Sequence, residues 1–347
     1  MNFPYAALSA VLALTSVTAF AADYPAPKQG EWIARDFKFH TGETMPELRL
    51  HYTTVGEPTG QPVLVLHGSG GSAASMLTPG FGGELFGPGQ PLDAAKNFLI
   101  IPDIIGFARS SKPSDGLRAS FPHYRLHDVA VAQHRLVTEG LKIPRAKLVM
   151  GLSLGGMLTW MFGGMFPDFM DALVPVASQP GPMSGRNWIQ RRINVEAIRN
   201  DPEWMGGDYE TQPTGWARVA PLSAMFTQSV VRIQEVGSTR EKADAFYRRL
   251  VENAQKGDAN NRLYQIESTM DYDPSADLEK IRAKLLAINF ADDAVNPPEL
   301  GVLEAGVARI SGARSVVVPA TSQSLGHQSS MHAALWKSHL AEFLKSA

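Results

Sequence analysis

The chain has 347 residues, 44% of them hydrophobic, which is long for one domain and short for two large ones. Its 32 basic and 34 acidic side chains give a formal charge of -2, and no basic run occurs, which argues against nucleic-acid or anionic-membrane partners. The absence of cysteine excludes disulfides, thiolate metal sites and cysteine nucleophiles.

The first 21 residues are typical of a secretory signal peptide. They carry no charged side chain, residues 6–20 are mostly small or apolar, and Ala19-Phe20-Ala21 has the spacing that a signal peptidase reads. The apolar run is shorter than the roughly 20 residues that span a bilayer, so we expect no stable membrane insertion. A buried N-terminal helix is the alternative. The signal interpretation predicts a periplasmic or secreted protein.

In residues 22–178, short apolar runs alternate with segments whose apolar residues recur at helical intervals. Such alternation predicts a parallel sheet covered by helices on both faces. A helix is expected over residues 127–140, where Val129, Ala132 and Leu136 recur at helical intervals. The runs that predict strands are Trp32–Phe39, Leu48–Val55, Val63–Leu66, Asn97–Pro102, Leu148–Met150 and Leu173–Val176.

Residues 179–282 differ in character from what precedes them. They are richer in charge, Trp and Met, and helical patches occur at 187–200 and 240–253. Strand patterns return at Lys284–Phe290 and Ser315–Val318, followed by a helix from about Ser330. We therefore predict a helical cap, residues 179–282, inserted between two parts of an α/β core, residues 22–178 and 283–347.

A Gly-x-Ser-x-Gly motif spans residues 151–155, with Ser153 at its centre. The apolar run before it and the helix-like run 156–166 after it provide the strand–turn–helix setting that a serine nucleophile needs. Glycines two residues on either side of the serine let neighbouring backbone approach without Cβ clashes. The pattern predicts that Ser153 is a nucleophile, and the alternative is a structural Gly-rich turn.

A serine hydroxyl needs a base, and that base must be oriented by an acid. Downstream of Ser153 the only histidines are His327, His332 and His339. We predict His327 as the base, because it lies in a loop, whereas the other two fall inside the expected C-terminal helix. The acid should follow Lys284–Phe290, where Asp292 and Asp293 compete, and spacing alone does not choose between them.

The developing oxyanion needs backbone N–H donors already in place. We predict one from Leu154, next to the nucleophile, and one from Ser69 in the Gly-rich loop after Val63–Leu66. That loop lacks the Lys-Ser/Thr ending of a phosphate-binding P-loop. Since a triad supplies nucleophile, base and acid, no metal or organic cofactor is implied.

Five segments of the chain have a pattern in common with one known family. They are 151–157, the preceding helix with Asp128 and Gln133, 197–202, 205–209 and 293–299. Together they resemble the homoserine O-acetyltransferase-like branch of the α/β-hydrolases. The resemblance implies an α/β-hydrolase fold with an inserted helical cap, Asp293 as the catalytic acid, and a homodimer formed through the cap.

The resemblance also implies substrate contacts, and two of three are changed here. Arg218 matches the cap arginine that holds the homoserine carboxylate. Met225 stands where the family has a tyrosine, and Gln328 stands where it has an aspartate that holds the substrate amine. A neutral Gln328 removes the counter-charge for an α-ammonium group.

We therefore expect an exported serine hydrolase that cleaves a small carboxylic ester through an acyl-enzyme. Acetyl-CoA is a cytosolic donor, so export favours water as the acceptor. An acyltransferase of the homoserine type and a non-catalytic binding module on the same scaffold are the alternatives. Epoxide hydrolases and haloalkane dehalogenases require Asp at the position of Ser153.

Overall fold

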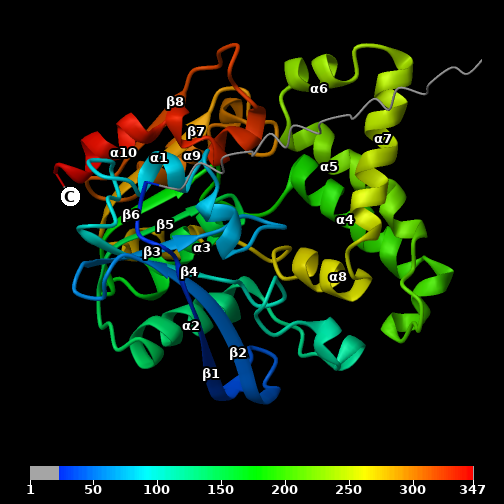
Figure 1. The fold of residues 1–347 in the computed structure, drawn as a ribbon, viewed down its shortest axis with the longest axis horizontal. Helices are drawn as coiled ribbons and strands as arrows, with labels where there is room; N and C mark the ends of the chain where they lie inside the picture. Colours follow the sequence, from blue (N-terminus) through cyan, green and yellow to red (C-terminus); the bar gives the residue numbers. More distant parts are fainter. Residues whose placement is uncertain (1–22, 347) are drawn as a thin grey trace, which may run out of the picture.

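The described part of the chain is built on one eight-stranded sheet (Figure 1). The computed structural model describes residues 23–346, so the predicted signal peptide, residues 1–21, lies outside them. The strand order is β1-β2-β4-β3-β5-β6-β7-β8. Strands β3 to β8 are mutually parallel, whereas β2 is antiparallel to both β1 and β4. The strands are β1 (Lys28–Lys38), β2 (Thr44–Val55), β3 (Gln61–Leu66), β4 (Asn97–Pro102), β5 (Ala146–Leu152), β6 (Met170–Val176), β7 (Lys284–Phe290) and β8 (Arg314–Val318).

Two apolar cores lie on opposite faces of the sheet. Leu64, Val149 and Leu173 pack with α2, α3 and α9 on one face. Val65 and Met150 pack with α1 and α10 on the other. The predicted parallel sheet with helices on both faces is therefore confirmed, because strands buried on both sides read as continuous apolar runs. The helices are α1 (Gly82–Leu85), α2 (Leu126–Arg135), α3 (Leu154–Met165), α4 (Gly185–Arg199), α5 (Ala220–Thr227), α6 (Val230–Val236), α7 (Arg240–Gln255), α8 (Ala259–Glu267), α9 (Val302–Val307) and α10 (Lys337–Leu344).

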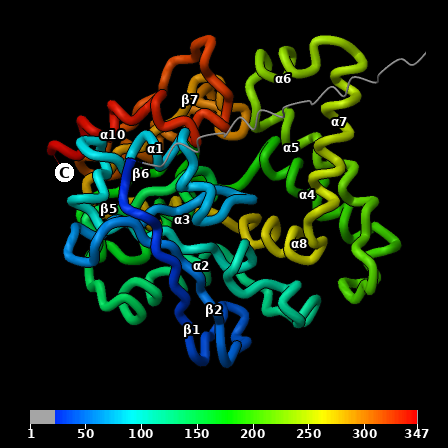
Figure 2. The backbone as a smooth tube through the Cα atoms, viewed as in Figure 1, coloured from blue at the N-terminus to red at the C-terminus, as the bar shows by residue number. Residues whose placement is uncertain are grey.

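Residues 179–282, all of them described, hold the five helices α4 to α8 and no strand. Figure 2 shows the tube leaving the core after β6, building these helices on the side away from the C-terminus, and returning to the core at β7. Helix α4 packs against α8 and against the short turn Gly215–Val219. No helix within residues 23–346 has both the length and the apolar character needed to cross a membrane.

The prediction of one helix from about Ser330 is wrong. Two short turns, Gly326–Met331 and Ala333–Leu335, precede α10, which begins only at Lys337. The interruption has a local cause, since the Ala333 amide donates to the Gly80 carbonyl at 2.8 Å and not to a carbonyl one turn earlier.

Candidate active site

Ser153 occupies a tight turn between β5 and α3. Its φ of 53° and ψ of -113° lie in a region that non-glycine residues rarely adopt, at a cost of about 1–3 kcal/mol. A Cβ at Gly151 would lie 2.2 Å from the Gly155 carbonyl oxygen, and one at Gly155 would lie 2.1 Å from the Leu66 carbonyl oxygen. Only glycine fits at both positions, and this close backbone packing holds the serine at the carboxyl end of the sheet.

The structure brings Ser153, His327 and Asp293 into one hydrogen-bonded series. The Nε2 atom of His327 lies 2.8 Å from Ser153 Oγ, and its Nδ1 atom lies 2.8 Å from Asp293 Oδ2. Asp293 follows β7, and His327 lies on the loop after β8, so three neighbouring regions of one sheet edge supply the three groups. This is the geometry of a nucleophile, a base and an orienting acid.

Asp293 is held as a carboxylate although it is only 2% exposed. Burial alone raises the pKa of its carboxyl group, but the charge and hydrogen bond of His327 oppose that effect. The backbone N–H groups of Val295 and Asn296 also donate to Oδ1 at 2.8 and 3.0 Å. The net result is a pKa below the ordinary aspartate value, so Asp293 stays ionised at neutral pH and can stabilise an imidazolium.

Asp292 has a different contact from its neighbour. Its Oδ2 accepts a hydrogen bond from the backbone N–H of Gly326 at 2.9 Å, one residue before the histidine. Asp292 therefore fixes the loop that carries His327, whereas Asp293 contacts the imidazole itself.

The Gly-rich loop after β3 lies directly against Ser153. A Cβ at Gly68 would be 3.4 Å from the Ser153 Cβ, and Ser69 lines the same cavity as Ser153. Leu154 is the first residue of α3, and the first N–H groups of a helix have no acceptor within it. The amides of Ser69 and Leu154 are thus on the two segments that flank Ser153, which suits an oxyanion site.

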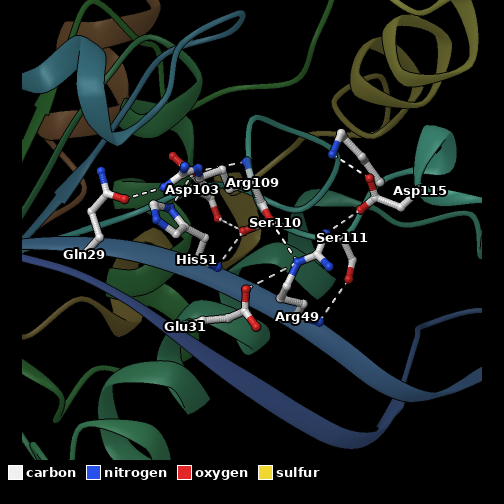
Figure 3. A network of polar contacts seen from close by, with 10 residues as sticks. Gln29, Glu31, Arg49, His51, Asp103, Arg109, Ser110, Ser111 and Asp115 are labelled. Carbon is white, nitrogen blue, oxygen red and sulfur yellow. Dashed lines mark hydrogen bonds and ion pairs between the residues drawn. The ribbon is translucent and has the colours of Figure 1, made fainter.

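Sequence reasoning missed the residues that brace this loop. The Asp103 carboxylate, at the end of β4, accepts hydrogen bonds from the Ala73 amide at 2.7 Å and the Arg109 amide at 3.2 Å. It also lies 2.8 Å from His51 Nδ1 (Figure 3). A carboxylate directly after a buried strand was the available signal, but its partners are distant in sequence.

His67 fixes the start of the same loop as a neutral imidazole. Burial lowers its pKa below the ordinary histidine value, although the Gly68 carbonyl and Asp103 oppose the shift. Its Nδ1 lies 2.9 Å from the Gly68 carbonyl oxygen, and the Ile104 amide donates to Nε2 at 3.2 Å. One nitrogen donates and the other accepts, so both are satisfied only when the ring is neutral.

A cavity of about 470 Å³ lies between these residues and the cap. That volume is typical of small-molecule sites. Gln328 and His327 both line it. The cap contributes mainly polar side chains, from α4 (Asn187, Gln190, Arg191, Asn194), α5 (Ser223, Thr227) and α8 (Arg262, Gln265).

Two of the implied substrate contacts are not at this cavity. Arg218 is exposed on the turn before α5, and Met225 on α5 is 66% exposed. Helix α5 presents Ser223 and Thr227, one turn apart, to the cavity. Met225 is two residues from Ser223, about 200° around the helix axis, and so faces away. Neither Arg218 nor Met225 lines the cavity that contains Ser153, so their assignment as substrate contacts stays a prediction.

The predicted position of His332 inside the C-terminal helix is also wrong. It lies between the two turns that precede α10, not within a helix, and it lines the cavity together with Met331. Among residues 23–346, no cluster of three or more His, Asp or Glu side chains is arranged to hold a metal ion.

Comparison with known proteins agrees with the fold. Residues 61–323 match the model of the alpha/beta hydrolase fold family. The chain is 33% identical over 226 residues to a homoserine O-acetyltransferase from Chlorobaculum parvum, which covers 60% of this chain and 61% of that relative. It is 30% identical over 301 residues to a homoserine O-acetyltransferase from Haloferax volcanii, covering 73% of this chain and 71% of that relative. An acetylester hydrolase from Corynebacterium glutamicum has a similar fold, with a TM-score of 0.79, 21% identity and coverage of 92% and 96% of the two chains. The chain therefore belongs to the alpha/beta hydrolase fold family, in the branch that includes homoserine O-acetyltransferases.

Proposed function

We propose that the protein is an exported serine hydrolase that cleaves a small carboxylic ester. The observation that carries this proposal is the Ser153–His327–Asp293 series, with both hydrogen bonds at 2.8 Å, facing a cavity large enough for a small substrate. Export is proposed on the first 21 residues of the sequence.

The proposed reaction proceeds through an acyl-enzyme. His327 takes the proton of Ser153 Oγ as that oxygen attacks the ester carbonyl carbon, and the amides of Leu154 and Ser69 hold the oxyanion. His327 then gives the proton to the leaving alcohol. Water attacks the acyl-enzyme with His327 as base, which releases the acid and restores Ser153.

The composition of the cavity favours water over homoserine as the acceptor. No Asp or Glu is among the described residues that line it, and the residue after His327 is Gln328. The α-ammonium group of homoserine would therefore enter without a counter-charge, which is costly in a partly buried site. The names of the sequence relatives support an acyltransferase as the second candidate.

The two candidates differ in what removes the acyl group from Ser153. With 4-nitrophenyl acetate as donor, we expect free acetate as the main product both with and without L-homoserine, as measured by mass spectrometry. The Gln328→Asp variant is the matched control, because it places a carboxylate beside the site and should raise any O-acetylhomoserine formed. O-acetylhomoserine as the main product of the unaltered protein would favour the transferase. No covalent labelling of Ser153 by a fluorophosphonate would favour a binding module.

We also propose that two copies associate through the cap. Trp188, Ile189 and Ile193 on α4 are exposed around one shallow apolar hollow, and apolar patches of this kind mark interaction sites. Analytical ultracentrifugation should give a dimer, and Ile189→Glu should give a folded monomer. The control is Leu300→Glu, which introduces a charge at a similarly exposed apolar residue outside the cap. A monomeric unaltered protein at micromolar concentration would contradict the proposal.

A further inference from the structure

Two arginines of the cap reach the cavity that contains Ser153. Arg191 comes from α4 and Arg262 from α8, two helices that pack against each other. Since no Asp or Glu of the described residues lines this cavity, the two guanidinium groups make it positively charged.

Within residues 23–346 neither guanidinium has a carboxylate partner. Arg191 Nε donates to Asn187 Oδ1 at 3.2 Å, which leaves its other donors free, and Arg262 has no side-chain partner. By contrast, Arg192, the next residue on α4, pairs with Glu196 at 2.7 Å. A guanidinium group carries five N–H donors, so these two retain most of their hydrogen-bonding capacity.

The pair is electrostatically unfavourable when the cavity holds no anion. Burial and, to a smaller extent, the nearby charge of Arg262 together lower the pKa of Arg191 to about 10. Burial also lowers the pKa of Arg262. Both groups remain protonated at neutral pH, so two like charges share one partly buried site. An anion between them would relieve the repulsion and satisfy the free donors.

We propose that Arg191 and Arg262 bind an anionic oxygen group of the substrate, so that the ester cleaved at Ser153 also carries a free carboxylate. This inference rests on the proposed function. A planar guanidinium matches a carboxylate bidentately, and the Asn187, Gln190 and Asn194 amides line the same wall. The substrate class is the half-ester of a dicarboxylic acid, or an acylated hydroxy acid, without an ammonium group.

The test compares two substrates that differ only in charge, 4-nitrophenyl hydrogen adipate and its neutral amide, 4-nitrophenyl adipamate. We expect kcat/KM to be about 10- to 100-fold higher for the acid, the size of a charge-assisted hydrogen bond. Arg191→Gln and Arg262→Gln should each bring the acid-to-amide ratio close to one. Arg248→Gln, a change of an exposed arginine on α7, should leave the ratio unaltered. A uniform loss of folded protein does not change the acid-to-amide ratio of kcat/KM. Arg191→Lys should keep part of the preference for the acid that Arg191→Gln removes.

A binding measurement separates this inference from the proposed hydrolysis. Calorimetry on the Ser153→Ala protein should show adipate binding that is lost in either arginine variant. Such binding without ester turnover by the unaltered protein would reject the hydrolase and keep the anion site. Equal turnover of acid and amide, with no adipate binding, would reject the anion site and keep the hydrolase. Tighter binding of inorganic phosphate than of adipate would overturn the assignment to a carboxylate.

Discussion

The Ser153→Ala protein should lose about four to six orders of magnitude in kcat towards 4-nitrophenyl acetate. The reason is that alanine removes the Oγ atom that lies 2.8 Å from His327 Nε2, so no acyl-enzyme can form. Residual turnover would come from the oxyanion site and substrate binding alone. Steady-state release of 4-nitrophenol measures the loss, and peptide mass spectrometry after fluorophosphonate treatment shows which serine reacts.

The matched control for that result is Ser223→Ala. Ser223 lines the same cavity from α5, but it has no hydrogen bond to a described histidine. This variant should keep its activity within about tenfold and its covalent label on Ser153. If Ser153→Ala retained more than a few per cent of the turnover, the nucleophile would have to be another residue.

The sheet could be predicted from sequence because its strands are buried on both faces. Each expected strand, from Trp32–Phe39 to Ser315–Val318, has an observed counterpart, and Lys284–Phe290 has the same bounds. The tight turn at Ser153 could be predicted for a related reason. The turn at Ser153 constrains the backbone so tightly that glycine is required at fixed spacings, and that requirement is visible in the sequence.

The cap side of the cavity could not be predicted in the same way. Family resemblance pointed to Arg218, whereas the arginines at the cavity are Arg191 and Arg262. Helix α4 has a polar sequence with little apolar periodicity, so its rotation is set by packing against α8 and the core. The side chains that face a ligand depend on that rotation, which no local pattern encodes.

The contacts of Asp103 with Ala73 and His51 were missed for a different reason. The hydrogen bond from the Ala73 amide to Asp103 joins residues 30 positions apart, and the contact with His51 spans 52 positions. Each residue alone is an ordinary polar side chain near a strand end. Their role arises only when the antiparallel pairing of β2 with β4 brings them together.

The choice between Asp292 and Asp293 leads to the second large expected effect. Asp293→Asn should lower kcat by about three to four orders of magnitude, because an amide can donate to His327 Nδ1 and so favours the wrong tautomer of the base. It also removes the negative charge that stabilises the imidazolium in the transition state.

Asp292→Asn is the control, one residue away and chemically the same change. Its side-chain oxygen can still accept the hydrogen bond from the Gly326 amide, so kcat should fall by less than about tenfold. Circular dichroism and thermal melting of both variants would separate a lost charge from a lost fold. If Asp292→Asn proved the more damaging of the two in folded protein, the position of the His327 loop would limit catalysis more than the carboxylate that contacts the ring, and Asp293 would lose its assignment as the acid.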